Sequence, residues 1–544
     1  MPIPVVFTFR FAGLMTLSEK GTHSNLARLQ SNANGNNDEA TPTTTLAAPI
    51  NRRFSYTSSL RKNVHRLTHK HFINMKSIIV GVATLFIIQM FYSPADAIPQ
   101  LSKHPVVLVV SFDGFRYDYL EKTDTPNLRA LQREGVTVPY MTPQFPSNTF
   151  PNHHSIATGL TPDNHGVTDN TFYDPLLGKN LSGFTDDWEF WNYSPDVLPF
   201  YIRNELAGDE RYSGCYMWAG SSTPYGADNE FRPTHYVAYN ASILWSERVD
   251  TVIEWITDAE KPANMVFLYY NEPDSAGHSF GTDDDRTVQI IQESDDRAGM
   301  LFDKLRAAEI YDQINIIILA DHGMQTVTRE RIITTTDIID RNLYQRLGSS
   351  PVYHILPNDP DDTERIYEAF KAASYTNGFS AYKKEELTHL KYSKNRRIMP
   401  ILLLADPGFA FENVNPNPNY GVHGYDPKFV NMSALFIAAG PQFKKGYTSQ
   451  LPVNNIDLVP LFAKIMNVAD VPSDGTVERV ELLLAPIETP TDAPTDAPTG
   501  APTDAPTDEP NDAPTDAPED NSAVRCASLT TIMVAITQIV VFNL

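Results

Sequence analysis

The stretch VVLVVSFDG at residues 106–114 decides the fold of this chain of 544 residues. Its first five residues form an uninterrupted apolar run, which is the pattern of a β-strand that is buried on both faces. Residues 265–270 (MVFLYY) and 314–320 (INIIILA) broadly repeat the run, and residues 435–439 (LFIAA) are a fourth candidate strand.

Helical patterns lie between these runs, at residues 126–134 and 286–308 among others. Strands that alternate with helices are typical of an α/β fold with a mostly parallel central sheet and helices on both faces. We expect one such domain over residues 98–485. The whole chain is 42% hydrophobic with two cysteines and a net charge of −23. The hydrophobic content excludes a wholly disordered protein, and two cysteines exclude a disulfide-rich scaffold. The negative charge argues against a nucleic-acid-binding surface, which would be basic.

Polar residues directly follow three of the strands. Asp113 follows the first strand, Asp274 and His278 follow the second, and Asp321 and His322 follow the third. Ligands of open α/β sheets bind beyond the carboxyl ends of the strands, so we expect these side chains to converge. Carboxylates and imidazoles are zinc ligands, and mixed sets of them suit sites with two metal ions. Taken alone, each aspartate could also belong to a turn or a helix cap, and each histidine could be a hydrogen-bonded structural residue.

Eight short motifs extend this pattern along the chain. In order, they are SFDGFR (111–116), TFPNH (149–153), TGL (158–160), HG (165–166), DN (169–170), EPDSAGH (272–278), DHGM (321–324) and HGYD (423–426). With these motifs, the chain resembles the ectonucleotide pyrophosphatase/phosphodiesterase family over residues 104–465. This family is a branch of the alkaline phosphatase superfamily. The resemblance implies an alkaline-phosphatase-like fold and a short member that consists of the catalytic domain.

The resemblance also implies an activity and a role for each matching residue. The enzyme would hydrolyse phosphodiester or pyrophosphate bonds of nucleotides, such as ATP or dinucleoside polyphosphates, and release a nucleoside monophosphate. Of two zinc ions, one would be held by Asp274, His278 and His423, and the other by Asp113, Thr149, Asp321 and His322. Thr149 would be the nucleophile that forms a phosphothreonine intermediate, and Asn170 would donate its side-chain amide to a phosphoryl oxygen.

The chemistry of Thr149 and Asn170 agrees with these implied roles. A threonine hydroxyl is a poor nucleophile at neutral pH, and a zinc ion lowers its pKa without a general base. Thr149 precedes a helical stretch, whose first N–H groups can face a phosphate. Outside this context, ordinary loop capping would be the preferred explanation of both residues.

Phe150 and Tyr239 are the residues expected to bind the nucleobase. In nucleotide-cleaving members of the family, the base is stacked between an aromatic residue after the nucleophile and a tyrosine further along the chain. These two positions match that pattern, although both rings could instead belong to the core. His154 and Thr161 stand where the family often has tyrosine, near the nucleophile, where they can alter packing or rate.

Two other functions stay open from the sequence. A phosphodiesterase of the same family that acts on choline lysophospholipids or sphingomyelin would need a cage of aromatic and acidic groups. Trp188, Trp191, Tyr193 and Trp218 leave that function open. A catalytically silent surface protein for adhesion is disfavoured, because every ligand and the nucleophile are present.

The two ends of the chain resemble targeting segments. After an upstream extension (1–74) that is disordered or untranslated, residues 75–97 have the basic start, apolar core and Ala-x-Ala site of a secretory signal peptide. Residues 486–521 form a stalk rich in Thr, Asp, Ala and Pro, and residues 522–544 resemble a GPI-attachment signal. A signal-anchor helix and a C-terminal transmembrane helix are the alternatives. Four sequons agree with secretion, at Asn180, Asn192, Asn240 and Asn431.

We therefore expect an enzyme on the extracellular face of the plasma membrane, with a secreted form also open. Treatment of intact cells with a phospholipase specific for GPI anchors should release it into the medium. An enzyme that stays on the cells, with residues 529–544 still present in the mature chain, would establish a transmembrane tail instead.

Overall fold

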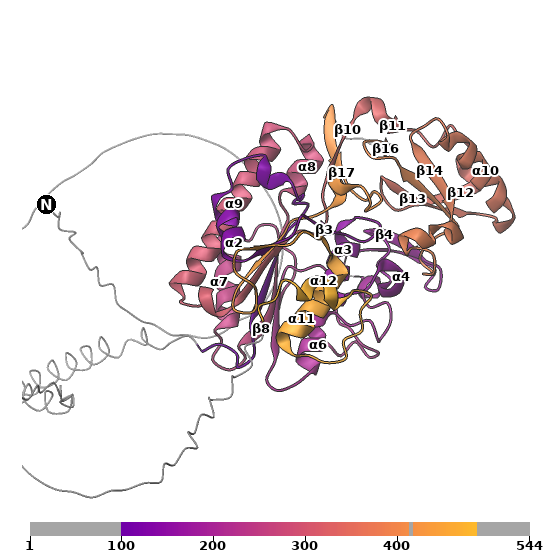
Figure 1. Cartoon of the computed structure of the whole chain (residues 1–544). Coiled ribbons are helices and arrows are strands. Elements are labelled where there is room, and N and C mark those ends of the chain that lie inside the picture. The colour runs from indigo at the N-terminus through magenta and orange to yellow at the C-terminus, as the bar shows by residue number, and fades with distance from the viewer. Residues whose placement is uncertain (1–99, 186, 413–416, 487–544) are drawn as a thin grey trace, which may run out of the picture. The chain divides into compact units, whose positions relative to one another are not determined.

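The computed structural model describes residues 100–185, 187–412 and 417–486 (Figure 1). The expected signal peptide and anchor segment, with nearly all of the expected stalk, lie outside the described residues and stay predictions. Within the described ranges, no helix is both long enough and apolar enough to cross a membrane.

An eight-stranded sheet forms the centre of the fold, in the order β19-β2-β18-β9-β1-β8-β6-β7. Its strands are β1 (Val107–Phe112), β2 (Val136–Thr137), β6 (Tyr212–Tyr216), β7 (His235–Val237), β8 (Ala263–Tyr270), β9 (Asn315–Leu319), β18 (Phe436–Ala439) and β19 (Tyr447–Thr448). Strands β9, β1, β8, β6 and β7 are parallel, whereas β18 runs antiparallel to β9 and β2. The expected α/β fold with a mostly parallel sheet is therefore confirmed.

The register of the three central strands brings their carboxyl ends to the same edge of the sheet. Phe112 of β1 lies opposite Tyr270 of β8, and Ser111 lies opposite Leu319 of β9. The residues that follow these strands must therefore meet, as the sequence predicts.

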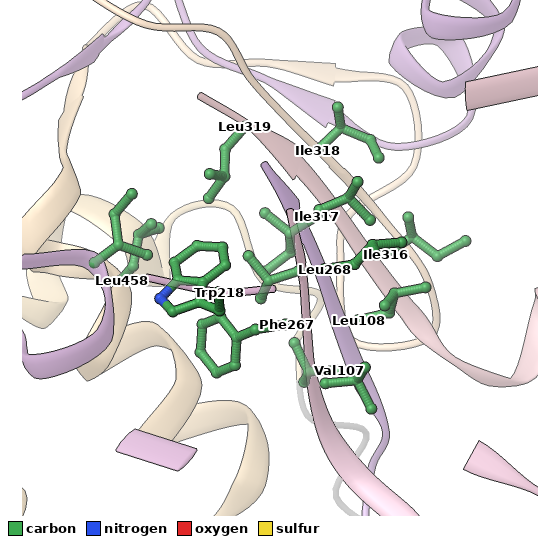
Figure 2. Packing of buried hydrophobic residues seen from close by; sticks show 14 of the residues in the cluster. Val107, Leu108, Trp218, Phe267, Leu268, Ile316, Ile317, Ile318, Leu319 and Leu458 are labelled. Carbon is green, nitrogen blue, oxygen red and sulfur yellow. The ribbon is translucent and has the colours of Figure 1, made fainter. Parts of the chain in front are cut away.

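Helices cover the sheet on both sides (Figure 1). One contacting group consists of α2 (Pro126–Glu134), α7 (Trp245–Ile256) and α9 (Asp285–Ala307). The other consists of α3 (Thr149–Thr158), α6 (Phe200–Leu206), α11 (Leu458–Met466) and α12 (Val477–Glu481). Side chains of β1, β8 and β9 fill the core together with Trp218 and Leu458 (Figure 2). Residues 107–110 are completely buried, because helices cover both faces of the strand.

A smaller lobe is inserted between β9 and β18. It consists of β12 (Tyr344–Leu347), β13 (Val352–Pro357), α10 (Thr363–Ser374), β14 (Phe379–Lys383) and β15 (Ile401–Ala405). The strands form an antiparallel sheet in the order β12-β13-β15-β14, which has a hydrophobic core of its own. The sequence alone does not predict this lobe, because strands such as β12 (YQRL) and β14 (FSAYK) are short and mix polar with apolar residues.

Shorter elements complete the described part of the chain. Two-stranded pairs are β3 (Met141–Thr142) with β20 (Val453–Asn454), β4 (Thr171–Asp174) with β5 (Lys179–Ser182), β10 (Gln325–Thr328) with β17 (Asn419–Val422), and β11 (Ile332–Ile333) with β16 (Ala410–Phe411). Short helices are α4 (Pro162–His165), α5 (Trp188–Trp191) and α8 (Asp274–Phe280).

A buried ion pair fastens the smaller lobe to the hairpin of β4 and β5. Arg397 donates from Nε to Asp174 Oδ2 at 2.7 Å and from Nη1 to the carbonyl oxygen of Gly166 at 2.8 Å. Burial raises the pKa of Asp174, but the hydrogen bonds from Arg396 and Arg397 outweigh it and lower that pKa to about 2. Loss of one partner of such a buried pair costs about 3–5 kcal/mol. The lobe is therefore held firmly beside the segment that carries Asn170.

Candidate active site

The carboxyl ends of the three central strands place three aspartates together. Asp113 follows β1, Asp321 follows β9, and Asp274 is the first residue of α8, after β8. The backbone N–H of Asp274 donates to the carbonyl oxygen of Asp113 at 3.0 Å, and that of Gly114 donates to Asp321 Oδ1 at 3.1 Å. Gly114 has a φ of +66°, and a Cβ atom there would lie 2.9 Å from Asp274 Cβ. Only glycine permits this close approach.

Three histidines face the aspartates. The rings of His322 and His423 are stacked, with centroids 3.6 Å apart. Nε2 of His278 lies 3.0 Å from Nε2 of His423, which in turn lies 3.6 Å from Asp274 Oδ1. The structure thus brings together every histidine and aspartate that the sequence predicts at the metal site.

Backbone carbonyls fix the protonation of these histidines. Nδ1 of His278 contacts the carbonyl oxygen of Gly421 at 2.9 Å, and Nδ1 of His423 contacts that of Ser147 at 2.9 Å. Nδ1 of His322 likewise contacts its neighbour's carbonyl oxygen at 2.8 Å. A carbonyl oxygen only accepts, so each Nδ1 carries the proton, and the Nε2 of a neutral ring then presents a lone pair. The Nε2 atoms of all three rings face the cluster, where a bound metal ion would take their lone pairs.

Three carboxylate oxygens of the cluster lack a hydrogen-bond donor among the described residues. They are Asp113 Oδ1, Asp274 Oδ1 and Asp321 Oδ2. Buried polar atoms without a partner are rare in native proteins. Carboxylate oxygens and imidazole nitrogens are the donors that bind divalent transition metals such as zinc, so these residues fit a metal centre.

The candidate ligand atoms fall into two groups, in each of which they lie within 4.8 Å of one another. The groups are Asp274, His322 and His423, and Asp113, His153 and Asp321. Nε2 of His322 also lies 3.5 Å from Asp113 Oδ1 and 3.1 Å from Asp321 Oδ2, so this ring reaches both groups. His278 lies at the exposed rim, with Nε2 3.4 Å from Asp274 Oδ1. The division of the ligands between two ions stays a prediction.

Negative charge is concentrated at this cluster. Burial raises the pKa of Asp113 well above its usual range, and the neighbouring carboxylates of Asp321 and Asp274 raise it further. Asp321 is also buried, which disfavours its charge, but His322 and His153 beside it lower its pKa. A bound cation would favour the charged forms of Asp113 and Asp321, because an opposite charge nearby stabilises a carboxylate.

Thr149 lies at the edge of the cluster. It is the first residue of α3, as the sequence predicts, and its Oγ1 is 3.2 Å from Nε2 of His322. The backbone N–H of Phe150 donates to Oδ1 of Asn170 at 3.0 Å. This bond fixes the orientation of the Asn170 amide, because Oδ1 is the acceptor and Nδ2 is therefore the donor of the group.

Two residues not predicted from the sequence also touch the cluster. On α3, Nδ1 of His153 is 2.9 Å from the carbonyl oxygen of Thr149 and 3.3 Å from Asp321 Oδ2. Tyr269 at the end of β8 donates its hydroxyl proton to Asp113 Oδ2 at 2.6 Å. Because His153 is four residues after Thr149, the helical spacing could have identified it. The sequence contains no comparable signal for Tyr269.

The two aromatic residues expected at the substrate site differ in exposure. The ring of Phe150 is half-buried and packs edge-on against Phe184, with centroids 4.8 Å apart. Tyr239 is 58% exposed, and its ring centroid is 6.1 Å from that of Tyr269. Tyr239 is therefore not a core residue. Whether the two rings enclose a nucleobase stays a prediction.

The comparison with known proteins agrees with this geometry. The profile of the family described as type I phosphodiesterase/nucleotide pyrophosphatase matches residues 107–426. The chain belongs to this family. It is a nucleotide pyrophosphatase/phosphodiesterase, as the sequence predicts.

Curated members of the family resemble the chain over most of its described part. Human ectonucleotide pyrophosphatase/phosphodiesterase family member 5 is 36% identical over 387 residues, which are 70% of this chain and 78% of that protein. Human bis(5'-adenosyl)-triphosphatase ENPP4 is 33% identical over 382 residues, which are 70% of this chain and 82% of that protein.

Solved structures of the family have the same fold. Murine family member 5 superposes with a TM-score of 0.66 at 36% identity, covering 70% of this chain and all of the murine chain. An inactive threonine-to-alanine variant of the murine protein in complex with AMP also has a TM-score of 0.66, at 35% identity and with the same coverage.

The departures from the family pattern are accommodated in the interior. His154 is buried between rings of other residues, and burial lowers its pKa to about 3, so it is neutral. Thr161 donates its hydroxyl proton to Asp474 Oδ2 at 2.9 Å. Among the candidate glycosylation sites, Asn180 and Asn240 are exposed, whereas the side-chain amides of Asn192 and Asn431 donate within the protein.

Proposed function

We propose that this enzyme is a zinc-dependent hydrolase that cleaves phosphodiester or pyrophosphate bonds of nucleotides through a phosphothreonine intermediate and releases a nucleoside monophosphate. The proposal rests on one observation. The hydroxyl of Thr149 lies 3.2 Å from Nε2 of His322, at the edge of a cluster of buried carboxylates and imidazole lone pairs. A hydroxyl in this position meets the requirement for activation by a bound cation.

The composition of the cluster favours zinc. Sets that combine imidazole nitrogen with carboxylate oxygen suit zinc, whereas magnesium and calcium prefer oxygen ligands alone. Asp113, Asp321, Asp274 and the histidines around them would hold two such ions. Bound there, they would lower the pKa of the attacking hydroxyl and stabilise the leaving oxygen.

The residues of the chain have distinct tasks in this mechanism. Oγ1 of Thr149 forms a bond to phosphorus while the bond from phosphorus to the leaving oxygen breaks, so the nucleoside stays esterified to the threonine phosphate. Asn170 donates from Nδ2 to a phosphoryl oxygen and stabilises the charge that develops there. Water then displaces Thr149 from phosphorus, which restores the hydroxyl and releases the nucleoside monophosphate.

The known relatives favour nucleotides over choline esters as substrates. Their names refer to nucleotide pyrophosphatase and bis(5'-adenosyl)-triphosphatase, and the variant of the murine relative was solved with AMP. The exposed ring of Tyr239 is a surface on which a base can stack, and stacking contributes about 1–3 kcal/mol per base. The proposed extracellular location rests on residues 75–97 and 522–544 alone.

The first prediction concerns the nucleophile. Thr149→Ala should reduce the turnover of thymidine 5'-monophosphate p-nitrophenyl ester to below about one per cent, because it removes the hydroxyl that would form the covalent intermediate. Thr149→Ser, the matched control, keeps the hydroxyl and should retain measurable turnover. In the wild type, acid quenching and mass spectrometry should detect a nucleotidylated peptide that contains Thr149. A Thr149→Ala enzyme with a tenth of the wild-type rate would contradict the assignment.

The second prediction concerns the metal. Chelation should abolish turnover, and zinc should restore it, because the hydroxyl of Thr149 depends on a cation for its deprotonation. Metal analysis should find two zinc ions per chain, and Asp274→Ala and Asp321→Ala should each bind fewer. Asp426→Asn is a suitable control, because its carboxylate accepts from the backbone of Lys428 and takes no part in the cluster. Full zinc content in both cluster variants would rule out this site.

The third prediction concerns substrate selection. Tyr239→Ala should lower kcat/KM for nucleotides by about 10- to 100-fold, because it removes one stacking surface. Hydrolysis of p-nitrophenyl methyl phosphate, which has no nucleobase, should change little. Tyr236→Ala removes another exposed tyrosine nearby in the sequence and serves as the control. Equal losses on both substrates would show that Tyr239 has a structural role only.

A further inference from the structure

Asp169 is a buried carboxylate beside the candidate site that the mechanism above does not use. It lies between α4 and β4 and has no exposed surface. Its Oδ1 accepts two hydrogen bonds, from the backbone N–H of Asn170 at 2.6 Å and from Nδ2 of Asn148 at 2.8 Å. Burial of a carboxylate costs free energy of folding, so the presence of Asp169 in the interior needs an explanation.

Asp169 and Asn170 together bind the residues on either side of Thr149 in the sequence. Asn148 is the residue before Thr149 and stands at the N-cap of α3, but its side chain makes no cap hydrogen bond and donates to Asp169 instead. Phe150, the residue after Thr149, donates its N–H to the Asn170 side chain. The dipeptide Asp169–Asn170 therefore holds both neighbours of the proposed nucleophile.

The smaller lobe closes the remaining side of the carboxylate. Gly348, in the connection between β12 and β13, has a φ of +82°, and a Cβ atom there would lie 2.7 Å from Asp169 Oδ2. Burial raises the pKa of Asp169 to about 7, although the hydrogen bonds from the Asn170 backbone and the Asn148 side chain oppose the shift, and Oδ2 has no hydrogen-bond partner among the described residues. With neighbours on every side, Asp169 has little room to move.

We propose that Asp169 is a positioning residue, which holds Thr149 and Asn170 in the relative geometry that attack on phosphorus requires. This inference rests on the proposed roles of Thr149 and Asn170. Displacement of reacting groups by about 1 Å costs on the order of 100-fold in rate, and a carboxylate that holds both segments prevents such displacement.

Asp295 offers a matched control, because it has the same local chemistry at a remote place. It is equally buried and accepts from the backbone N–H of Leu128 at 2.7 Å and from Nδ2 of Asn127 at 2.9 Å. These contacts join α9 to α2, away from the cluster of ligands. Asp295→Ala therefore removes a buried carboxylate with comparable partners and leaves Thr149 and Asn170 undisturbed.

A double-mutant cycle tests the proposal. Asp169→Ala, Asn170→Ala and the double variant are compared with the wild type, by kcat and KM for the p-nitrophenyl nucleotide ester and by the melting temperature. Asp169→Ala should lower kcat by about 10- to 100-fold with KM within about threefold, because the loss falls on the transition state. The loss in the double variant should be about tenfold smaller than the product of the single losses, because Asp169 acts partly through Asn170. Asp295→Ala should lower the melting temperature and leave kcat unchanged.

The outcomes separate this inference from the proposed function. If Asn170→Ala keeps the wild-type kcat, the donor role of Asn170 fails, and the positioning role fails with it. If Asn170→Ala is impaired but Asp169→Ala is not, or if the two losses multiply fully, only the positioning role is overturned. If Asp169→Ala does not fold, Asp169→Asn takes its place in the cycle, because the amide keeps the shape and one acceptor oxygen but loses the charge.

Discussion

Repulsion among three carboxylates, two of them buried and that of Asp274 partly exposed, is the constraint on which the rest of the site depends. Asp113, Asp274 and Asp321 meet at one edge of the central sheet, and each has an oxygen without a hydrogen-bond donor in the described part of the chain. Two like charges about 4 Å apart repel by about 4 kcal/mol at the effective dielectric of a protein. Such a cluster is stable in its charged form only around cations, so the fold must hold the carboxylates in place for them.

The central sheet supplies that rigidity. Strands β1, β8 and β9 are adjacent, parallel and buried on both faces, so their ends cannot separate without breaking the core. The histidines are oriented in a different way, because the backbone carbonyls of Gly421, Ser147 and Gly323 each accept from an Nδ1. The strand ends position the carboxylates, and the backbone carbonyls orient the imidazoles. Together they hold the ligand atoms in place for a metal ion.

Much of this arrangement could be predicted from the sequence. There are physical reasons why the other features could not. The apolar runs predict β1, β8, β9 and β18, because strands buried on both faces need continuous apolar residues. The positions of Asp113 and Asp321 follow from strand ends alone. The smaller lobe has short strands of mixed polarity. Asp113, the partner of Tyr269, is 156 residues away in the sequence, and Asn148, a partner of Asp169, is 21 residues away. Such contacts depend on tertiary packing, which no local pattern encodes.

Tyr269 joins substrate recognition to the chemistry of the site. Its hydroxyl donates to Asp113, while its ring makes edge-on contacts with those of His153 and Tyr239, with centroid distances of 5.2 and 6.1 Å. If a base stacks on Tyr239 as we propose, it packs against a ring that contacts Tyr269. Tyr269 in turn donates to Asp113, a proposed metal ligand. One residue at the end of β8 thus contacts both the ring that we propose binds the base and an aspartate of the cluster.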